Sequence, residues 1–228
     1  TLRGKRGCWP VITSLVPKPE KDQAILSIRA PRTLVERLIL LKLDQVIGDC
    51  FRAVEPATCD VNLLLLYAEH GNVLRRGAGG KATIANSIII GKCVTDRLSI
   101  RNCLFCGQAR IDLEYTTVLE SCTLATDLLL GGSGHTVVNC LVRNLTINPD
   151  TSGHIIHHCA TFADRHPPPE AKDSFLANPM FRDPANLDYR LMPGSPCIGK
   201  ASDGGDIGCR YTPEMMELIN VALELRRR

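Results

Sequence analysis

One short phrase recurs five times between residues 83 and 159, and it constrains the fold more than any other feature of the chain. In each copy an apolar residue is followed by a polar bend residue, usually Asn, and then by a small residue, usually Cys. The small residues are 16, 19, 18 and 19 residues apart, at Ser87, Cys103, Cys122, Cys140 and Cys159. A period of about 20 residues is typical of a solenoid, in which one coil cannot bury its apolar face without its neighbours.

The segments between these phrases have the pattern of strands. Residues 111–115, 128–130 and 145–147 alternate or run apolar over a few positions, and glycines or polar residues separate them. Leucine-rich repeats have a similar length, but their leucine and asparagine framework is missing here. The pattern therefore predicts an all-β fold, a right-handed parallel β-helix of roughly seven coils, followed by a C-terminal amphipathic α-helix.

Equivalent positions of successive coils in such a fold lie about 4.8 Å apart, which is the spacing of paired strands. The chain has 11 cysteines, an odd number concentrated at one phase of the repeat, and this argues against a disulfide framework. We therefore expect an inward column of free thiols at Cys103, Cys122, Cys140 and Cys159. We expect bonded amides along the bend at Asn86, Asn102 and Asn139. The redox state stays open for Cys8, Cys50, Cys197 and Cys209.

Composition argues against two classes of partner. The net charge of +3 and the 4% of aromatic residues are too low to favour nucleic-acid binding. No apolar run approaches the ~20 residues of a membrane span. Because the chain begins at Thr1 without a methionine, we expect it to be a piece of a longer protein, so its first residues do not indicate a location.

The sequence pattern changes after Cys159, where the repeat ends. A segment with three consecutive prolines is interpreted as a rigid loop, and a distinctive phrase follows it. This phrase comprises Phe181, residues 183–186 (DPAN), 188–191 (DYRL) and 193–196 (PGSP), Ile198, and residues 206–208 (DIG). It resembles the C-terminal signature of bacterial right-handed parallel β-helix proteins of the pectate-lyase-like superfamily. It departs from that signature at Gly199 and Lys200, where the family tends to have an aspartate.

The last residues have the clearest helical pattern. Thr212 suits the N-cap, Pro213 the first helical position, and the three terminal arginines the negative end of the dipole. One face of the helix carries Met215, Leu218, Ile219, Ala222 and Leu225. We expect residues 1–211 to form the β-helix domain, with an irregular cap from about residue 162, and residues 212–228 to form a helix that covers an edge strand. A docking helix for a neighbouring domain is the alternative.

The family resemblance implies an interaction with carbohydrate. Enzymes of this kind bind an extended acidic polysaccharide along one outer sheet; lyases use a Lys or Arg base and often calcium, and hydrolases use clustered aspartates. The strands predicted here expose alternate residues, so the catalytic candidates are Asp112, Glu114 and Asp127. The candidates for binding the substrate are Lys92, Arg97, Arg110 and Asn144. Against a site, Leu129 interrupts this track, and charged residues outside a sheet are ordinarily solvated surface.

We therefore expect a carbohydrate-interacting module of a larger bacterial protein, non-catalytic in this fragment. A polysaccharide lyase or glycoside hydrolase is one alternative, and a purely structural scaffold or assembly domain is another. The expected partners are a polysaccharide and neighbouring domains of the parent chain, with neither nucleic acid nor a membrane span.

No cofactor is expected, with calcium only in the case of a lyase. A metal site is not expected either, because His154 and His158 would lie about 13 Å apart on one strand, whereas a metal needs both within about 2.1 Å. The family resemblance suggests an extracellular or cell-surface location, while free thiols are compatible with the cytoplasm.

Overall fold

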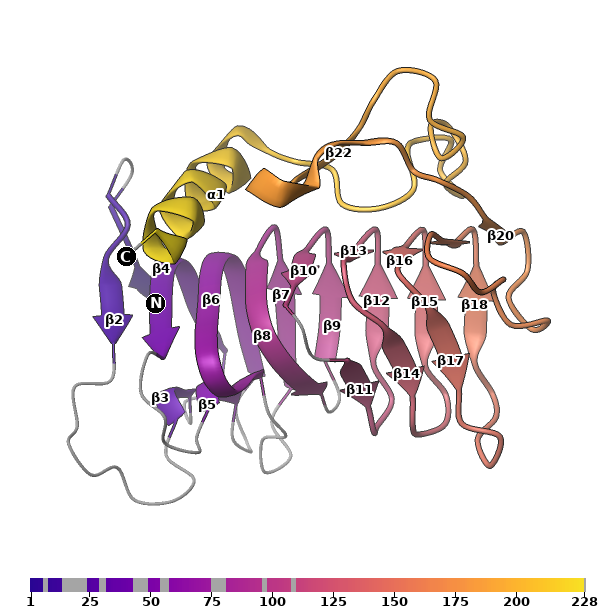
Figure 1. The fold of residues 1–228 in the computed structure, drawn as a ribbon. Helices are drawn as coiled ribbons and strands as arrows, with labels where there is room; N and C mark the ends of the chain where they lie inside the picture. The colour runs from indigo at the N-terminus through magenta and orange to yellow at the C-terminus, as the bar shows by residue number, and fades with distance from the viewer. Residues whose placement is uncertain are drawn as a thin grey trace.

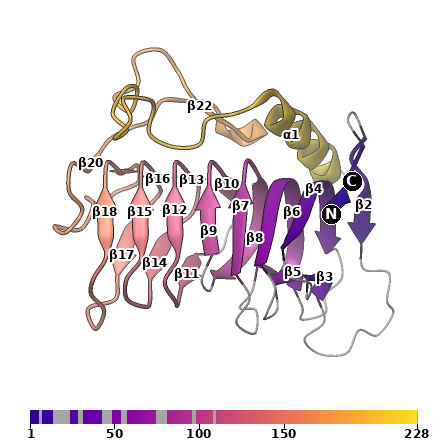
Figure 2. The same ribbon diagram turned by 180° about the vertical axis from the view of Figure 1, so that it is seen from behind.

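The computed structural model describes residues 1–5, 8–13, 24–28, 32–42, 49–53, 58–74, 81–95, 98–107 and 110–227. These residues form a parallel β-helix, the predicted fold, in which strands of successive coils stack in three sheets (Figures 1 and 2). The structure has about five turns, against the seven predicted. The number is smaller because the coils before Thr58 are only partly described and the last coil is incomplete.

The first sheet contains the strands that precede the bend of each coil. All its pairings are parallel, and equivalent residues of the repeat lie opposite one another, as Ile84 does with Ile100 and Leu119 with Val137. Its strands are β1 (Leu2–Arg3), the first parts of β4 (Thr33–Lys42) and β6 (Thr58–Leu74), β7 (Lys81–Ala85), β9 (Leu98–Arg101), β12 (Val118–Glu120), β15 (Thr136–Val138) and β18 (Ile155–His157).

The other two sheets follow the bend. The second contains β2 (Val11–Thr13), later parts of β4 and β6, β8 (Ile88–Thr95), β10 (Leu104–Cys106), β13 (Thr123–Leu124), β16 (Leu141–Val142), β19 (Ala160–Thr161) and β20 (Phe175–Leu176). The third contains β3 (Ala24–Ile28), β5 (Asp49–Ala53), the ends of β6 and β8, β11 (Ile111–Leu113), β14 (Leu128–Leu130) and β17 (Leu145–Ile147). The long strands β4, β6 and β8 turn the corners and join the sheets into one hydrogen-bonded network.

The bend between the first and second sheets has the same backbone conformation in every regular coil. Its residue is left-handed, with φ between 49° and 57° at Asn86, Asn102, Ser121, Asn139 and His158. Asparagine tolerates this conformation better than most residues do, because its short side chain bonds locally. The repeated Asn of the sequence therefore has a conformational cause.

The residue after each bend is the expected inward column, and its cysteines are buried free thiols. Each side chain donates a hydrogen bond to the carbonyl two residues earlier, from 2.7 Å at Ser87 to 3.3 Å at Cys159. The column continues at Ser174, which bonds the carbonyl of Lys172 in the same way at 2.9 Å. This position therefore needs a side chain that is small, fits the interior and carries a donor, and cysteine and serine meet that need. Burial raises the pKa of Cys103 and Cys140 well above the ordinary thiol value.

The bend amides of Asn86 and Asn102 bond to each other, and Asn86 bonds in turn to Asn62, which lies one position before the left-handed Leu63. Asn86 Nδ2 donates to Asn62 Oδ1 at 2.9 Å, and Asn102 Nδ2 donates to Asn86 Oδ1 at 2.7 Å. The expectation was wrong for Asn139, which bonds to Ser202 in the C-terminal segment. The amide column stops because the next bend residue after Asn102 is Ser121, whose side chain has no amide to continue it.

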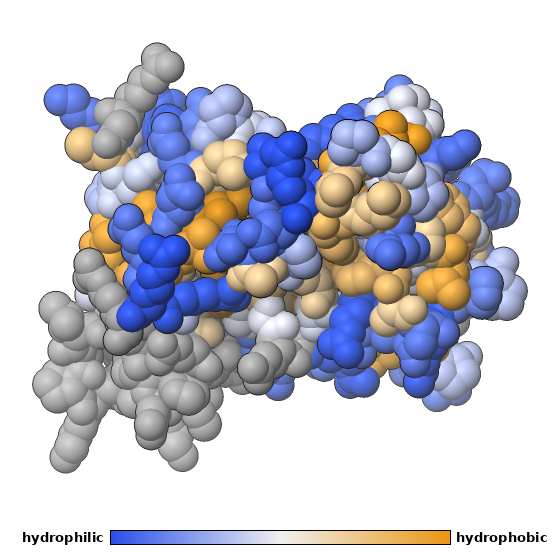
Figure 3. Space-filling view, turned by 45° about the horizontal axis from the view of Figure 1, so that its top comes forward, coloured by the Kyte–Doolittle hydropathy of each residue, from blue (hydrophilic) through white to orange (hydrophobic). Residues whose placement is uncertain are grey.

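The second sheet is buried on both of its faces. Its inward side chains join the interior core, and its outward side chains, such as Leu65, Ile88 and Leu104, pack under the C-terminal segment. Continuous apolar strands are typical of parallel sheets covered on both sides. This explains the apolar runs at residues 38–41, 63–66 and 88–90. In the first sheet, by contrast, buried and more accessible residues alternate along the strands. Figure 3 brings the covered side forward and shows hydrophilic side chains over it with apolar ones between them.

The predicted helix is α1 (Pro213–Arg226), and it begins as expected, with the side chain of Thr212 accepting a hydrogen bond from Met215 N at 3.2 Å. Its buried residues are Met215, Leu218, Ile219 and Ala222. The helix lies on the outward face of β6 and β8 instead of covering an edge strand (Figure 1). Apolar side chains on that face, which an exposed sheet would not carry, are the physical reason for this location.

The chain between β20 and α1 is the cap, residues 177–211, because residues 172–176 still follow the coil through the pairing of Lys172 with His157 and of β20 with β19. It contains a small antiparallel pair, β21 (Phe181–Asp183) and β22 (Asp188–Leu191), joined by the 3₁₀ turn Pro184–Asn186. Asp183 caps this turn, and Asp188 pairs with Arg190 across 2.7 Å. The residues of the C-terminal phrase thus form tight turns and local ion pairs that hold the cap in shape.

Candidate functional site

The predicted catalytic residues lie on or beside strands of the third sheet, and two of them, Asp112 and Asp127, are paired with arginines. Asp112 is the central residue of β11, and its Oδ1 is 2.6 Å from Nε of Arg110. Its register partner on the next coil is Leu129, so no carboxylate lies beside it there. Glu114 is exposed just beyond the end of β11.

Asp127 belongs to a different column. It precedes Leu128, which pairs with Ile111, so Asp127 lies level with Arg110 rather than with Asp112. Its Oδ1 accepts a hydrogen bond from Asn144 Nδ2 at 3.1 Å and lies 3.6 Å from Nε of Arg143. Asp112 is therefore paired with Arg110, and Asp127 is paired with Arg143.

The predicted substrate-binding residues are divided between surface and interior. Lys92 and Arg110 are exposed on the third-sheet side, as expected. Asn144 was expected to be exposed, but it is only 9% accessible, because its side chain folds onto Asp127. Arg97 lies outside the described residues.

The histidines do not gather around a common point. His135 is fully buried and stacks on His154 with ring centroids 5.4 Å apart, and its Nδ1 accepts a hydrogen bond from Thr117 N. His157 and His158 are joined through their Nδ1 atoms at 3.0 Å. In the described part of the chain, no three His, Cys, Asp or Glu side chains are grouped as metal ligands.

A groove that sequence reasoning missed runs along the start of the first sheet. It encloses about 570 Å³ and spans the beginnings of β6, β7, β9 and β12. We call it the first-sheet groove; its main lining residues are Thr58, Lys81, Thr83, Ser99, Thr116 and Val118. A sequence signal existed: the third residue before the bend is Thr or Ser at Thr83, Ser99 and Thr136.

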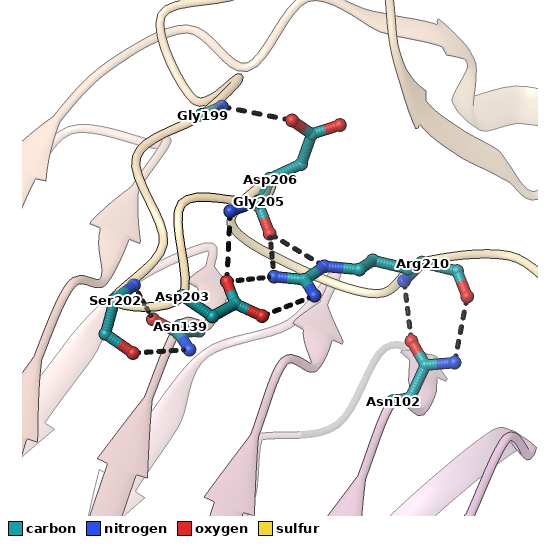
Figure 4. A network of polar contacts seen from close by, with 8 residues as sticks. All are labelled: Asn102, Asn139, Gly199, Ser202, Asp203, Gly205, Asp206 and Arg210. Carbon is teal, nitrogen blue, oxygen red and sulfur yellow. Dashed lines mark hydrogen bonds and ion pairs between the residues drawn. The ribbon is translucent and has the colours of Figure 1, made fainter.

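The cap is attached to the bend column by polar contacts (Figure 4). Asn102 Oδ1 accepts from Arg210 N at 2.6 Å, and Asn139 Oδ1 accepts from Ser202 N at 2.8 Å. The guanidinium of Arg210 also donates hydrogen bonds to both carboxylate oxygens of Asp203 at 2.7 Å, and it holds the pKa of Asp203 well below its usual range. The side-chain amides at the bends thus accept hydrogen bonds from backbone N–H groups of the cap that would otherwise bond to water.

A second missed feature lies where the cap leaves the bend column. It encloses about 620 Å³, and we call it the corner hollow; its main lining residues are His158, Asp173, Phe175, Pro196, Lys200 and Ala201. These residues come from the last bend, from β20 and its preceding turn, and from the cap. No repeat relates these three segments, so periodicity in the sequence gave no signal of their approach.

The comparisons with known proteins add no relative. Neither a family model, nor a curated protein, nor a solved structure matches the chain. The fold defines the class of the protein, a parallel β-helix solenoid with one C-terminal helix. Among the described residues, no helix is long and apolar enough to cross a membrane.

Proposed function

We propose that this β-helix is a non-catalytic module that binds an extended polysaccharide along its first sheet. The observation that carries the proposal is the first-sheet groove, which is lined by the hydroxyl side chains of Thr58, Thr83 and Ser99 together with Lys81. Hydroxyls both donate and accept hydrogen bonds, which suits a polymer of hydroxylated rings. Apolar side chains beside them, such as Val118, offer contact to the ring faces.

The repeat of the β-helix also suits a polymer that lies along its axis. Equivalent side chains recur about every 4.8 Å from coil to coil. Thr83 and Ser99 are register partners on neighbouring strands, so they present the same group at successive steps. An extended sugar chain would therefore meet hydroxyls at these two steps, with Asp60 at the step before them and Val118 at the step after them.

Catalysis on the third sheet has less support. The carboxylates of Asp112 and Asp127 each lie beside an arginine, Asp112 at 2.6 Å from Arg110 and Asp127 at 3.6 Å from Arg143. The proposed binding role needs no cofactor, and calcium would belong to the lyase alternative.

Affinity electrophoresis tests the proposal, with the full chain run in gels that contain neutral or acidic extended polysaccharides. We expect at least one polymer to retard the protein. Thr83→Val replaces a hydroxyl by a methyl group of similar size, and we expect it to weaken binding about two- to tenfold, the worth of one neutral hydrogen bond. Thr136→Val is the matched control, because Thr136 continues the same outward column beyond the groove.

Two outcomes would contradict the proposal. An equal loss in Thr136→Val would show that the groove is not the binding surface, and no retardation by any polymer would leave a purely structural role. Release of unsaturated uronate from an acidic polysaccharide, abolished in Asp112→Ala and Glu114→Ala, would show instead that the chain is an enzyme.

A further inference from the structure

The third sheet lacks one strand at the C-terminal end of the solenoid. β17 is its last strand (Figure 1), and among the described residues it pairs only with β14. The first and second sheets continue for another coil, through β18, the bridge of His157 with Lys172, and β20. The chain that would supply the missing strand is residues 163–171, which contain three consecutive prolines and which we call the proline segment. Proline has no N–H to give to a ladder, so this segment does not pair along β17.

The proline segment is fixed by contacts of its own and leaves a gap beside β17. Its last bond to the preceding coil joins Ala163 N to Arg143 O at 3.0 Å. Beyond that point, Thr161 Oγ1 donates to Arg165 O at 2.6 Å and holds the segment in a bend. A slot of about 390 Å³ remains between the proline segment and β17 with the residues just after it, and we call it the third-sheet slot. On the proline side it is lined by Arg165, His166, Pro168 and Glu170.

The outer edge of β17 has unpaired backbone groups. Alternate residues of a strand bond to opposite neighbours. The C=O of Asn144 accepts a bond from β14, and the N–H of Asn148 donates to Leu130 O at 3.0 Å. Leu145 and Ile147 therefore direct their N–H and C=O groups the other way, and within the described ranges none of these four groups has a hydrogen-bond partner. Leu145 is only 4% exposed, and unpaired backbone groups at a buried residue are costly.

The side chains of β17 show how an added strand would face. Leu145 and Ile147 point into the solenoid, in register with Leu128 and Leu130 of the preceding coil, whereas Thr146 is exposed. Ile147 is only half-buried, while Leu130 has no exposed surface. An apolar side chain one step further along the axis would cover Ile147 as Ile147 covers Leu130.

Unpaired N–H and C=O groups that alternate along a strand edge are complementary to an extended polypeptide backbone. We propose that the third-sheet slot binds an extended peptide segment of another protein as an added parallel strand on β17, with apolar residues at two alternate positions facing the core. In this mode of recognition, main-chain hydrogen bonds supply affinity and alternate side chains supply specificity. Parallel addition repeats the pairing of β14 with β17. A slip of one residue would turn the apolar side chains outward, so they set the register.

Isothermal titration of the full chain with a capped peptide that copies residues 143–148 (RNLTIN) tests the slot. In the parallel register, the N–H of the peptide's threonine faces β17 and the N–H of its isoleucine faces away. N-methylation of the threonine should therefore weaken binding about tenfold, the loss of one hydrogen bond with its acceptor left unpaired. N-methylation of the isoleucine should leave binding unchanged and is the matched control. Equal binding of the two methylated peptides would overturn the proposal, and so would no binding of the unmodified peptide.

Amide hydrogen exchange followed by NMR shows where the peptide binds. The N–H groups of Leu145 and Ile147 should exchange about tenfold more slowly when the peptide is present, because each gains an acceptor. Ile147→Pro removes one of these groups, which an edge strand tolerates, and it should weaken peptide binding about tenfold. Ile147→Val keeps the N–H and should bind the peptide as the unsubstituted chain does. Peptide binding that leaves the exchange of both amides unchanged would refute the location.

Sedimentation velocity without the peptide tests the other occupant, a second copy of this chain. A concentration-dependent dimer that the peptide dissociates would show that the slot holds a second copy, and it would overturn the proposal. The proposal is independent of the polysaccharide role. If polysaccharides retard the chain but the peptide does not bind, this proposal fails and the proposed function stands.

Discussion

Asn139 joins the bend column to the cap, and its replacement gives a direct measure of that junction. The residue is only 4% exposed and has a left-handed φ of 57°. Its amide makes two bonds to Ser202, one from the backbone N at 2.8 Å and one to the hydroxyl at 3.0 Å. Asn139→Ala removes both bonds and leaves a residue that tolerates the left-handed region poorly.

The expected loss follows from these two effects. Two neutral hydrogen bonds contribute about 1 kcal/mol each to stability, and a left-handed alanine costs about a further 1 kcal/mol. Asn139→Ala should therefore lower the free energy of unfolding by about 3 kcal/mol. Asn139→Gly removes the same bonds without the conformational strain, so it should lower it by about 2 kcal/mol.

Urea unfolding followed by circular dichroism measures these differences, and hydrogen exchange of peptides from residues 199–210 shows whether the cap detaches first. Ser121→Ala is the matched control, because Ser121 has the same conformation, φ 52°, one coil earlier. A loss below about 0.5 kcal/mol in Asn139→Ala, within the range of ordinary surface substitutions, would refute the role given to these bonds. A glycine variant less stable than the alanine variant would refute the strain argument.

Two further predictions concern the buried imidazoles and thiols. Burial lowers the pKa of His135 and of His154, so the unfolded chain binds protons more readily than the folded chain. The stability from these residues is present above the unfolded pKa of about 6.5 and is lost as pH falls below it. The urea concentration at the midpoint of unfolding should therefore be lower at pH 5 than at pH 7.5. An equally steep decrease in His135→Gln would contradict this. Burial also raises the pKa of Cys106 to about 12 and removes it from solvent, whereas Cys8 is exposed. Because the thiolate is the reactive form, a thiol reagent at pH 8 should label Cys8 in the native protein and should label Cys106 and Cys140 only in denaturant. Peptide mapping by mass spectrometry measures this labelling. Labelling of Cys140 in the native protein would refute the buried column.

The amino-acid sequence by itself determined the parallel β-helix, the column of small residues and the C-terminal helix. Each of these depends on contacts that recur at a fixed separation. Cys103, Cys122 and Cys140 stack because one coil takes about the same number of residues each time, and Met215, Leu218 and Ala222 share a face because a helix has a period of 3.6 residues. Residues that recur at a fixed distance in the structure therefore also recur at a nearly fixed spacing in the sequence, where the pattern can be recognised.

Only the tertiary structure decided what covers the second sheet and which polar groups meet. Asn102 bonds to Arg210, 108 residues away, and no repeat connects the two. The pairing of Asp127 with Arg143 on the next coil depends on the register of the two strands. In the corner hollow, Asp173 and Lys200 come from segments that no repeat relates. The physical reason is that the cap folds back over the coils through single, non-repeating contacts, and these are specified by shape and hydrogen bonding in three dimensions.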